Sequence, residues 1–310
     1  MKSASSKALA VFACFLWATA FMGVKIGLES MPPFLFAGIR FFLAGAVVAL
    51  LYRKKGKGQQ FRQYWKQMLV TGFFQTFGLY SLFFYSLTLM RASTGAIVNG
   101  LGPLIVALTA HFTLAGSRLN KRQFFSLVLG AAGGILVSFA GHTAGSEAGA
   151  SELKGIVLML TALIVGAAAS VIVAKSPDGL DPFLLNSGQL MGGGILLLAA
   201  AALTGQRSYG DIPVLEFTAA LSWLVFVSAA GFSIWYYLLK IRKEPLSELA
   251  VWRFLIPLAG AVLSWILMKD DNPEALSVAG MALTAFSIYL FYKSPGKRRG
   301  RSGYSDSTTT

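Results

Sequence analysis

Two arginines, Arg40 and Arg253, stand inside long apolar stretches of the chain. A charged side chain within a membrane span is costly, so it marks a functional site by default. A guanidinium binds a carboxylate or a phosphate through two parallel hydrogen bonds. Self-comparison of the sequence pairs Arg40 with Gln189 and Arg253 with Asn99. The pattern predicts a polar or anionic ligand held between these side chains.

Further polar and aromatic residues complete the predicted substrate-binding set. Amide groups come from Asn99, Gln189, Gln75 and Asn186, and aromatic rings come from Trp17, Tyr80 and Trp252. Two alternatives stay open. The first is that each arginine extends its guanidinium toward the nearer membrane interface or ties helices together. The second is that the aromatic rings belong to an interfacial belt or to helix packing.

Two prolines, Pro103 and Pro257, occupy matching positions in the two halves of the chain. Proline removes a backbone donor and weakens the helical turn that precedes it, here near Asn99 and Arg253. Carbonyl groups freed in this way are usable where they line a cavity. We therefore predict that both prolines mark helix breaks with a gating role, and the alternative is a kink that merely fits the packing.

The composition indicates which elements must position these residues. Of 310 residues, 55% are hydrophobic and only 13% are charged, against about 25% charged in soluble domains. So much apolar surface excludes an ordinary soluble protein. Stretches of about 20 mainly apolar residues predict transmembrane helices. The sequence contains ten of them, at 8–28, 34–52, 67–88, 93–115, 123–141, 155–174, 183–204, 217–239, 248–268 and 276–292.

The formal net charge of +14 reports on orientation. If both termini are cytoplasmic, 20 of the 27 Lys and Arg residues fall on the inside and two, Arg40 and Arg253, within spans. The outside set is Lys25, Arg91, Lys154, Arg207 and Lys269. Basic residues concentrate in cytoplasmic loops. We therefore predict a multi-pass membrane protein with both termini cytoplasmic, and nucleic acid is not needed to explain the charge.

An internal repeat relates the two halves. The segment Pro33-Phe34-Leu35-Phe36 matches Pro182-Phe183-Leu184-Leu185, and at the same offset Gly45 falls on Gly194. Because five helices is an odd number, the second copy is expected to cross the membrane inverted. The predicted fold is an all-α membrane protein with ten transmembrane helices in two inverted five-helix repeats. The repeats cover 1–145 and 152–293, and a disordered, basic and polar cytoplasmic tail covers 294–310.

These residues carry a family resemblance. The chain resembles the EamA branch of the drug/metabolite transporter superfamily, ten-helix exporters and permeases of the inner membrane. The resemblance rests on Leu16-Trp17-Ala18-Thr19-Ala20-Phe21 with Lys25, on Ala37-Gly38-Ile39-Arg40-Phe41, on Leu101-Gly102-Pro103-Leu104, on residues 130–137 and on Val278-Ala279-Gly280. It implies a secondary transporter that exports a small metabolite, such as an amino acid or an organic anion, by alternating access.

Other function classes remain as alternatives. A non-transporting membrane interaction or sensor protein and a carrier for drugs or toxic compounds are both left open. An enzyme is not expected, because it would need clustered His, Asp or Glu, and the chain has two histidines. No cofactor or metal is expected either. The expected partners are a small-molecule substrate and the lipid bilayer, and a homodimer is left open.

Overall fold

The computed structural model describes residues 2–52, 56–90, 95, 98–139, 150–205, 214–267 and 275–293. Every regular element in this part of the chain is a helix. The predicted tail at 294–310 lies outside the described residues. In the first half the elements are α1 (Lys2–Ser30), α2 (Pro33–Leu51), α3 (Lys57–Gly72), the π-helix η1 (Phe73–Gly78), α4 (Leu79–Leu87), α6 (Gly102–Thr113), the short 3₁₀ turn η2 (Ala115–Ser117) and α7 (Lys121–Phe139).

The second half continues with α8 (Ala150–Ala174), α9 (Pro182–Leu203), α10 (Val214–Lys240), α11 (Leu246–Trp252), α12 (Leu255–Leu267) and α13 (Ala275–Lys293). Within the described residues, six helices are long and apolar enough to cross a membrane. They are Pro33–Leu51, Gly58–Leu87, Ser151–Ala174, Pro182–Leu203, Val214–Lys240 and Ala275–Lys293. The predicted count of ten spans and their inverted relation stay predictions.

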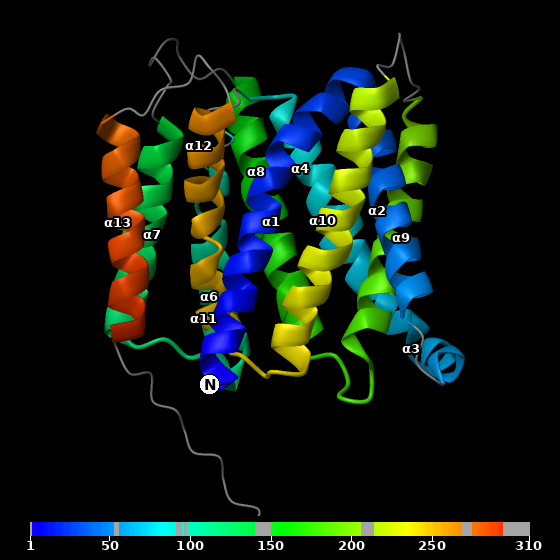
Figure 1. The fold of residues 1–310 in the computed structure, drawn as a ribbon, viewed down its shortest axis with the longest axis horizontal. Helices are drawn as coiled ribbons and strands as arrows, with labels where there is room; N and C mark the ends of the chain where they lie inside the picture. Colours follow the sequence, from blue (N-terminus) through cyan, green and yellow to red (C-terminus); the bar gives the residue numbers. More distant parts are fainter. Residues whose placement is uncertain are drawn as a thin grey trace, which may run out of the picture.

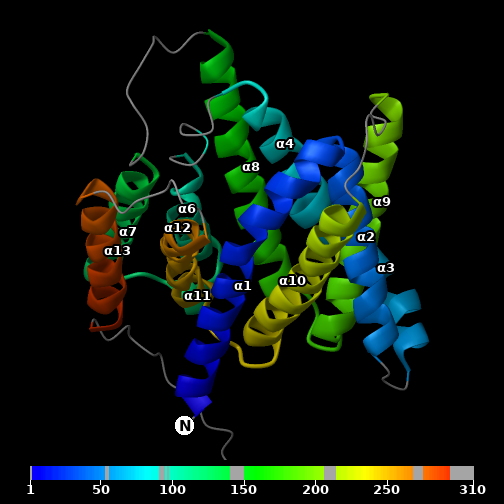
Figure 2. The same ribbon diagram turned by 45° about the horizontal axis from the view of Figure 1, so that its top comes forward.

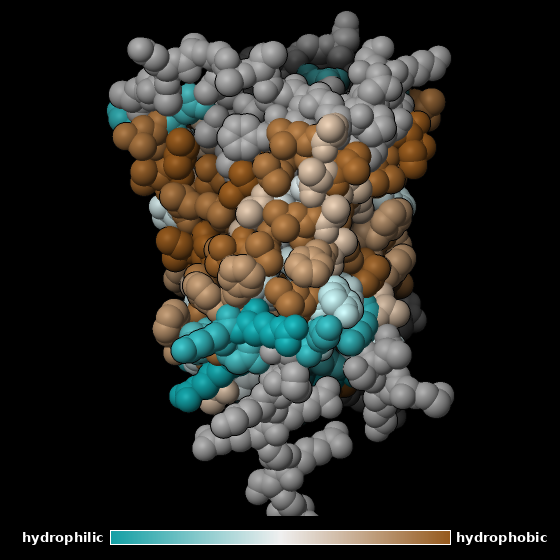
Figure 3. All heavy atoms as spheres, turned by 90° about the vertical axis from the view of Figure 1, so that its left-hand side faces the viewer, coloured by the Kyte–Doolittle hydropathy of each residue, from teal (hydrophilic) through white to brown (hydrophobic). Residues whose placement is uncertain are grey.

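Most helices stand side by side (Figure 1). The beginning of α3 is seen nearly end-on at the end of the bundle where α1 begins, and α3 continues through η1 into α4, so that Gly58–Leu87 form one long helical stretch. The described end of α13 lies at that same end of the bundle. The hydrophobic band in Figure 3 covers the face formed by α7 and α13, with hydrophilic residues beneath it. This arrangement is that of an integral membrane protein, in which apolar side chains face lipid.

The helices pack mainly across the two halves of the chain. The most extensive contacts pair α2 with α9, α7 with α13, and α1 with α10. The α4 helix packs on α8, α6 packs on both α8 and α11, and α1 also packs on α12. The turned view shows α1 and α10 crossing next to α8 and α2 (Figure 2). The apolar core therefore consists of residues from both halves, among them Phe41, Ala107, Leu185, Tyr236 and Phe254.

Candidate functional site

Arg40 lies on α2, inside the bundle, with only 6% of its surface exposed. Its Nε donates a 2.9 Å hydrogen bond to Oγ of Ser228 on α10. The guanidinium also lies 4.9 Å from the ring centroid of Phe41. In the described part of the chain this is the one hydrogen bond of the Arg40 side chain, so its terminal N–H groups have no protein acceptor there. Arg40 therefore links α2 to α10 and keeps donors available for a ligand.

Arg253 occupies the break between α11 and α12. The α11 helix ends at Trp252, and the chain turns at Arg253 and Phe254 before α12 begins at Leu255. The side chain is half-buried, and no hydrogen-bond partner lies near its guanidinium among the described residues. A desolvated guanidinium without an acceptor favours binding of an anion.

Tyr80 on α4 lies within electrostatic range of both Arg40 and Arg253, and the buried thiol of Cys14 on α1 lies within range of Arg253. The Tyr80 ring packs 4.5 Å from that of Phe41. Neither arginine has a carboxylate among its resolved electrostatic partners. The structure thus brings together three of the sequence-predicted residues, Arg40, Tyr80 and Arg253, around a site that carries positive charge without a described counter-ion.

Three of the four predicted amides lie in or beside a buried polar chain between α9 and its neighbours. Thr76 Oγ1 donates to Gln189 Oε1 at 2.6 Å, and Gln189 Nε2 donates to Asn186 Oδ1 at 3.0 Å. Asn186 Nδ2 in turn donates to Ser233 Oγ of α10 at 2.9 Å. Gln75 is buried next to Thr76 in the π-helix, an element frequent at functional sites. Gln189 and Asn186 are therefore held mainly by other side chains of the protein.

Replacing Thr76 with valine is expected to destabilise the fold, and it leaves the charge of the protein unchanged. Valine has almost the same shape but leaves Gln189 Oε1 without its donor in a fully buried position. An unsatisfied buried acceptor costs about 1–3 kcal/mol. Thermal unfolding of the purified variant should show a lower midpoint, while the substrate concentration for half-maximal transport should stay unchanged. A changed substrate affinity at normal stability would instead place Gln189 in the binding site.

The remaining predicted residues lie at separate contacts. Trp17 packs on Phe232 and Trp235 of α10, with ring centroids 5.6 and 5.2 Å away. Trp252 packs on Tyr292 of α13 at 5.2 Å, which is a contact at the junction of α11 and α13. Asn99 is half-buried and makes no hydrogen bond within the described residues.

Both prolines stand in the first turn of a helix that follows a break. Pro103 is the second residue of α6, and Pro257 is the third residue of α12. The chain is non-helical just upstream, at Gly100–Leu101 and at Arg253–Phe254. A proline in a first turn removes a donor that has no intrahelical acceptor, so the two helices start there at little cost. The gating role of these breaks stays a prediction.

The sequence interpretation missed several polar residues. Ser228 and Ser233 are the partners of Arg40 and Asn186, yet nothing in their spacing points to residues so far away in the chain. Ser81 Oγ and Tyr236 Oη are buried hydroxyls without a hydrogen-bond partner among the described residues. Buried polar groups normally have partners. Among the described residues no group of three His, Cys, Asp or Glu is placed to hold a metal ion.

A charged cluster joins the end of α10 to the loop at residues 175–181. Lys240 is 5% exposed and donates to the carbonyl of Ser176, and its Nζ lies 3.7 Å from Asp178 Oδ1. Lys243 donates to the same carboxylate. The hydrogen bond from Lys243 and the charges of Lys243 and Lys240 hold the pKa of Asp178 below its usual range.

Acidification is expected to loosen this connection. A lowered pKa means that the ionised carboxylate stabilises the folded state above its ordinary pKa of about 3.9, and that this stabilisation disappears as the pH falls through the lowered value. Asp178 is exposed, so the effect is small. Wild type should unfold at a slightly higher temperature than Asp178→Asn at pH 7, and the difference should vanish at strongly acidic pH. A difference independent of pH would contradict the assignment.

Comparison with known proteins gives consistent matches along the chain. Residues 5–139 and residues 153–293 each match the EamA-like transporter family. An uncharacterized transporter of Archaeoglobus fulgidus is 26% identical over 89% of this chain and 93% of its own. The uncharacterized transporter YvbV of Bacillus subtilis is 26% identical over 91% and 90%. The uncharacterized inner membrane transporter YedA of Escherichia coli K12 is 26% identical over 74% and 73%.

A known crystal structure has the same fold as this chain. It superimposes with a TM-score of 0.80 at 20% identity and covers 93% of this chain and 96% of that chain. At this identity the likeness concerns the arrangement of helices alone.

Proposed function

Because the chain belongs to the EamA-like transporter family, which both of its halves match, we propose that it is a secondary transporter for small anionic metabolites. It works by alternating access between two inverted five-helix repeats. The substrates are organic anions or amino acids, which present a carboxylate, and export is the direction that the family resemblance implies. Two buried or half-buried arginines within electrostatic range of Tyr80, with no carboxylate among their described partners, carry this proposal.

The energetics of charge in a membrane favour an anionic substrate. Removing two guanidinium groups from water is expensive in a low-dielectric interior. Arg40 is compensated by Ser228 and by the face of Phe41, whereas the Arg253 side chain has no described hydrogen-bond partner. A carboxylate bound to them would accept charge-assisted hydrogen bonds and offset the cost of their desolvation. The substrate would thus act as the missing counter-ion.

The packing supports a two-fold relation between the halves. If each helix of the first half corresponds to the one five spans later, the contact of α1 with α10 corresponds to that of α8 with α4. The contact of α1 with α12 corresponds to that of α8 with α6, and that of α2 with α10 to that of α9 with α3. The pairs α2 with α9, α7 with α13, and α6 with α11 each map onto themselves. Inverted repeats of this kind place substrate sites at their interface.

The charges support an orientation with both termini in the cytoplasm. Basic residues outside the membrane gather at the end where α1 begins, including Lys7, Lys121, Arg122, Arg242 and Lys293. Positively charged loops remain on the cytoplasmic side of a membrane. The name of the Escherichia coli relative agrees with an inner membrane location.

A ligand screen tests the substrate class. Purified protein is heated with matched pairs of compounds that differ only in a carboxylate and its neutral amide or ester. Bound substrate raises the apparent melting temperature by mass action, so carboxylates should stabilise the protein and their neutral analogues should not. Compounds that pass are then tested for saturable flux in proteoliposomes. Stabilisation by neutral or cationic compounds alone, or no saturable flux for any stabilising compound, would overturn the proposal.

A further inference from the structure

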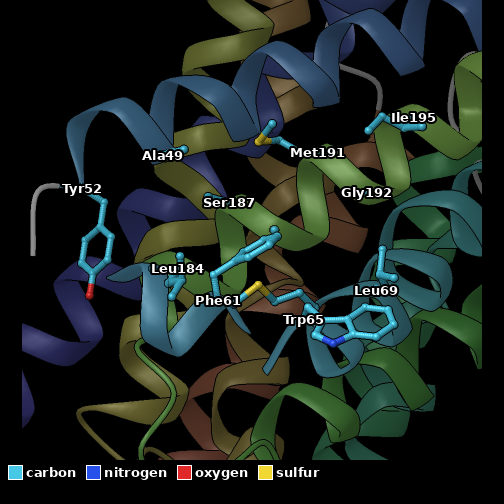
Figure 4. A pocket seen from close by; sticks show the side chains of 13 residues that line it. Ala49, Tyr52, Phe61, Trp65, Leu69, Leu184, Ser187, Met191, Gly192 and Ile195 are labelled. Carbon is cyan, nitrogen blue, oxygen red and sulfur yellow. The ribbon is translucent and has the colours of Figure 1, made fainter. Parts of the chain in front are cut away.

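An apolar groove lies on the outside of the bundle, between α3 on one side and α2 with α9 on the other. Its volume is about 540 Å³. Figure 4 shows Tyr52 at one end of the groove and Trp65, Leu69 and Ile195 toward the other. Of the residues that line it, Phe61 and Ile195 are each 52% exposed. None of the residues around Tyr80 lines this groove, so it is separate from the candidate transport site.

Gly192 on α9 leaves part of the groove unfilled, whereas Gly188 lets Met68 of α3 pack closely on α9. Gly188 and Gly192 both line it, next to Met68 and Leu69 of α3. A methyl group on Gly192 would meet only the tip of the Leu69 side chain, at 3.2 Å. A larger side chain at this position would therefore fill the groove without striking backbone. An unfilled apolar groove on a membrane-facing surface fits a hydrocarbon chain.

Basic residues border the groove on its α3 side. Arg62 and Lys66 follow Gly58 at intervals of four residues, so the three share one ridge of α3, and both basic side chains are exposed. The Lys66 ammonium lies 5.7 Å from the centroid of the Trp65 ring. Residues 52–67 contain six basic and no acidic residues. The basic residues belong to the beginning of α3, which lies at the end of the bundle where α1 begins, and this position places lysine and arginine at lipid head groups.

One acidic residue faces the opposite end of the groove. The Asp181 carboxylate accepts a 3.0 Å hydrogen bond from the backbone N–H of Phe183, and it also interacts with the Tyr52 hydroxyl. Asp181 is thus occupied in starting α9 and in holding Tyr52. The exposed positive charges of Arg62 and Lys66 therefore make the α3 side of the groove attractive to anionic groups.

We propose that this groove binds an anionic glycerophospholipid, with an acyl chain between α3 and α9 and the phosphate at Arg62 and Lys66. The groove itself is too apolar for a small anionic metabolite, and the basic ridge gives it a preference that ordinary surrounding lipid does not have. The proposed orientation places this end of the bundle in the cytoplasm, where the membrane surface is negative.

Quenching of Trp65 fluorescence tests the site. The full-length protein is placed in phosphatidylcholine nanodiscs that contain a small fraction of lipid with brominated acyl chains, either phosphatidylglycerol or phosphatidylcholine. The signal of Trp65 is the difference between wild type and Trp65→Phe, because the chain has six tryptophans. Each basic residue strengthens binding of anionic lipid about five-fold, so phosphatidylglycerol should quench at about 30-fold lower mole fraction than phosphatidylcholine.

Three variants separate the two parts of the site. Arg62→Gln/Lys66→Gln should remove the preference for phosphatidylglycerol and leave the quenching by phosphatidylcholine. Gly192→Leu should weaken quenching by both lipids, since it fills the groove. Lys121→Gln/Arg122→Gln, which removes two exposed basic residues from the start of α7 at the opposite side of the bundle, should behave as wild type.

Three outcomes would overturn the proposal. Equal quenching by the two brominated lipids would show that Trp65 contacts ordinary surrounding lipid without a preference for the anionic one. A preference that persists in Arg62→Gln/Lys66→Gln would place the anionic lipid elsewhere. Absence of quenching together with a doubled particle mass, measured by native mass spectrometry, would show that a second copy of the chain covers the groove.

Discussion

Replacing Arg253 with glutamine is expected to lower substrate flux at limiting concentration by about 10- to 150-fold, because hydrogen bonds to charged groups contribute about 1.5–3 kcal/mol. Glutamine keeps polarity and approximate length but removes the charge and the two-pronged geometry. The Arg253 side chain makes no described hydrogen bond to the protein, so its replacement should leave the fold intact. The measurement is uptake of the carboxylate from the ligand screen into proteoliposomes, with protein quantity and melting temperature determined in parallel.

Two comparisons show whether charge or geometry is responsible. Arg253→Lys restores the charge without the planar fork, so it should recover only part of the flux. Lys121→Gln removes an exposed charge far from the site and should transport normally. Normal flux in Arg253→Gln would remove the main support for an anionic substrate. Loss of both flux and stability would make Arg253 a structural residue.

Arg40 requires a different comparison because it already has a protein partner. Arg40→Gln breaks the bond to Ser228, so both stability and transport are expected to fall. Ser228→Ala breaks the same bond but leaves the guanidinium in place. If Arg40 only ties α2 to α10, the two variants should behave alike. If it also contacts the substrate, Arg40→Gln should lose more transport than Ser228→Ala at similar stability.

Apolar length and helix-breaking residues allow much of the helical arrangement to be predicted. The prediction that the chain is an all-helical membrane protein is confirmed, and the family resemblance is confirmed by the match of both halves. The two spaced arginines could be singled out because a charge within an apolar run is rare. The apolar length of a span and a charge within it are properties of a single helix, so composition and spacing are enough to predict them.

The partners of these residues are properties of the packed bundle. Arg40 and Ser228 are 188 residues apart, and no periodicity relates them. The π-helix that holds Gln75 and Thr76 packs against α8 and α9, two helices from the other half of the chain. The groove beside α3 likewise requires α9, which is distant in the chain from α2 and α3. Gly45 and Gly194 are an exception, because their pairing in the repeat could be read from the sequence.

Adding a methyl group at Gly45 or at Gly194 is expected to destabilise the protein by about 3 kcal/mol in each case, the upper part of the usual cost of overpacking. The Cβ of Gly45→Ala would lie 2.7 Å from the Met191 nitrogen on α9. The Cβ of Gly194→Ala would lie 2.6 Å from the Phe42 nitrogen on α2. Backbone atoms cannot move aside as flexible side chains do, so α2 and α9 must separate. Small residues are what allow such close helix contacts in membranes.

Gly260→Ala is the matched control for these two variants. It lies within α12, and a Cβ there would meet nothing within 4 Å. Since alanine is favoured over glycine in a helix by about 1 kcal/mol, this variant should be as stable as wild type or more so. The readout is the melting midpoint of the purified protein, which should fall by several degrees in Gly45→Ala and Gly194→Ala only.

The size of the two losses also tests the two-fold relation between the halves. Gly45 lies against the backbone of α9 in the way that Gly194 lies against the backbone of α2, and the repeat places the two glycines at equivalent positions. Equivalent positions in a symmetric contact should lose similar stability, and the double variant should lose less than the sum, because the first substitution already separates the helices that the second would push apart. A large loss in one variant with none in the other would contradict an inverted repeat at this contact.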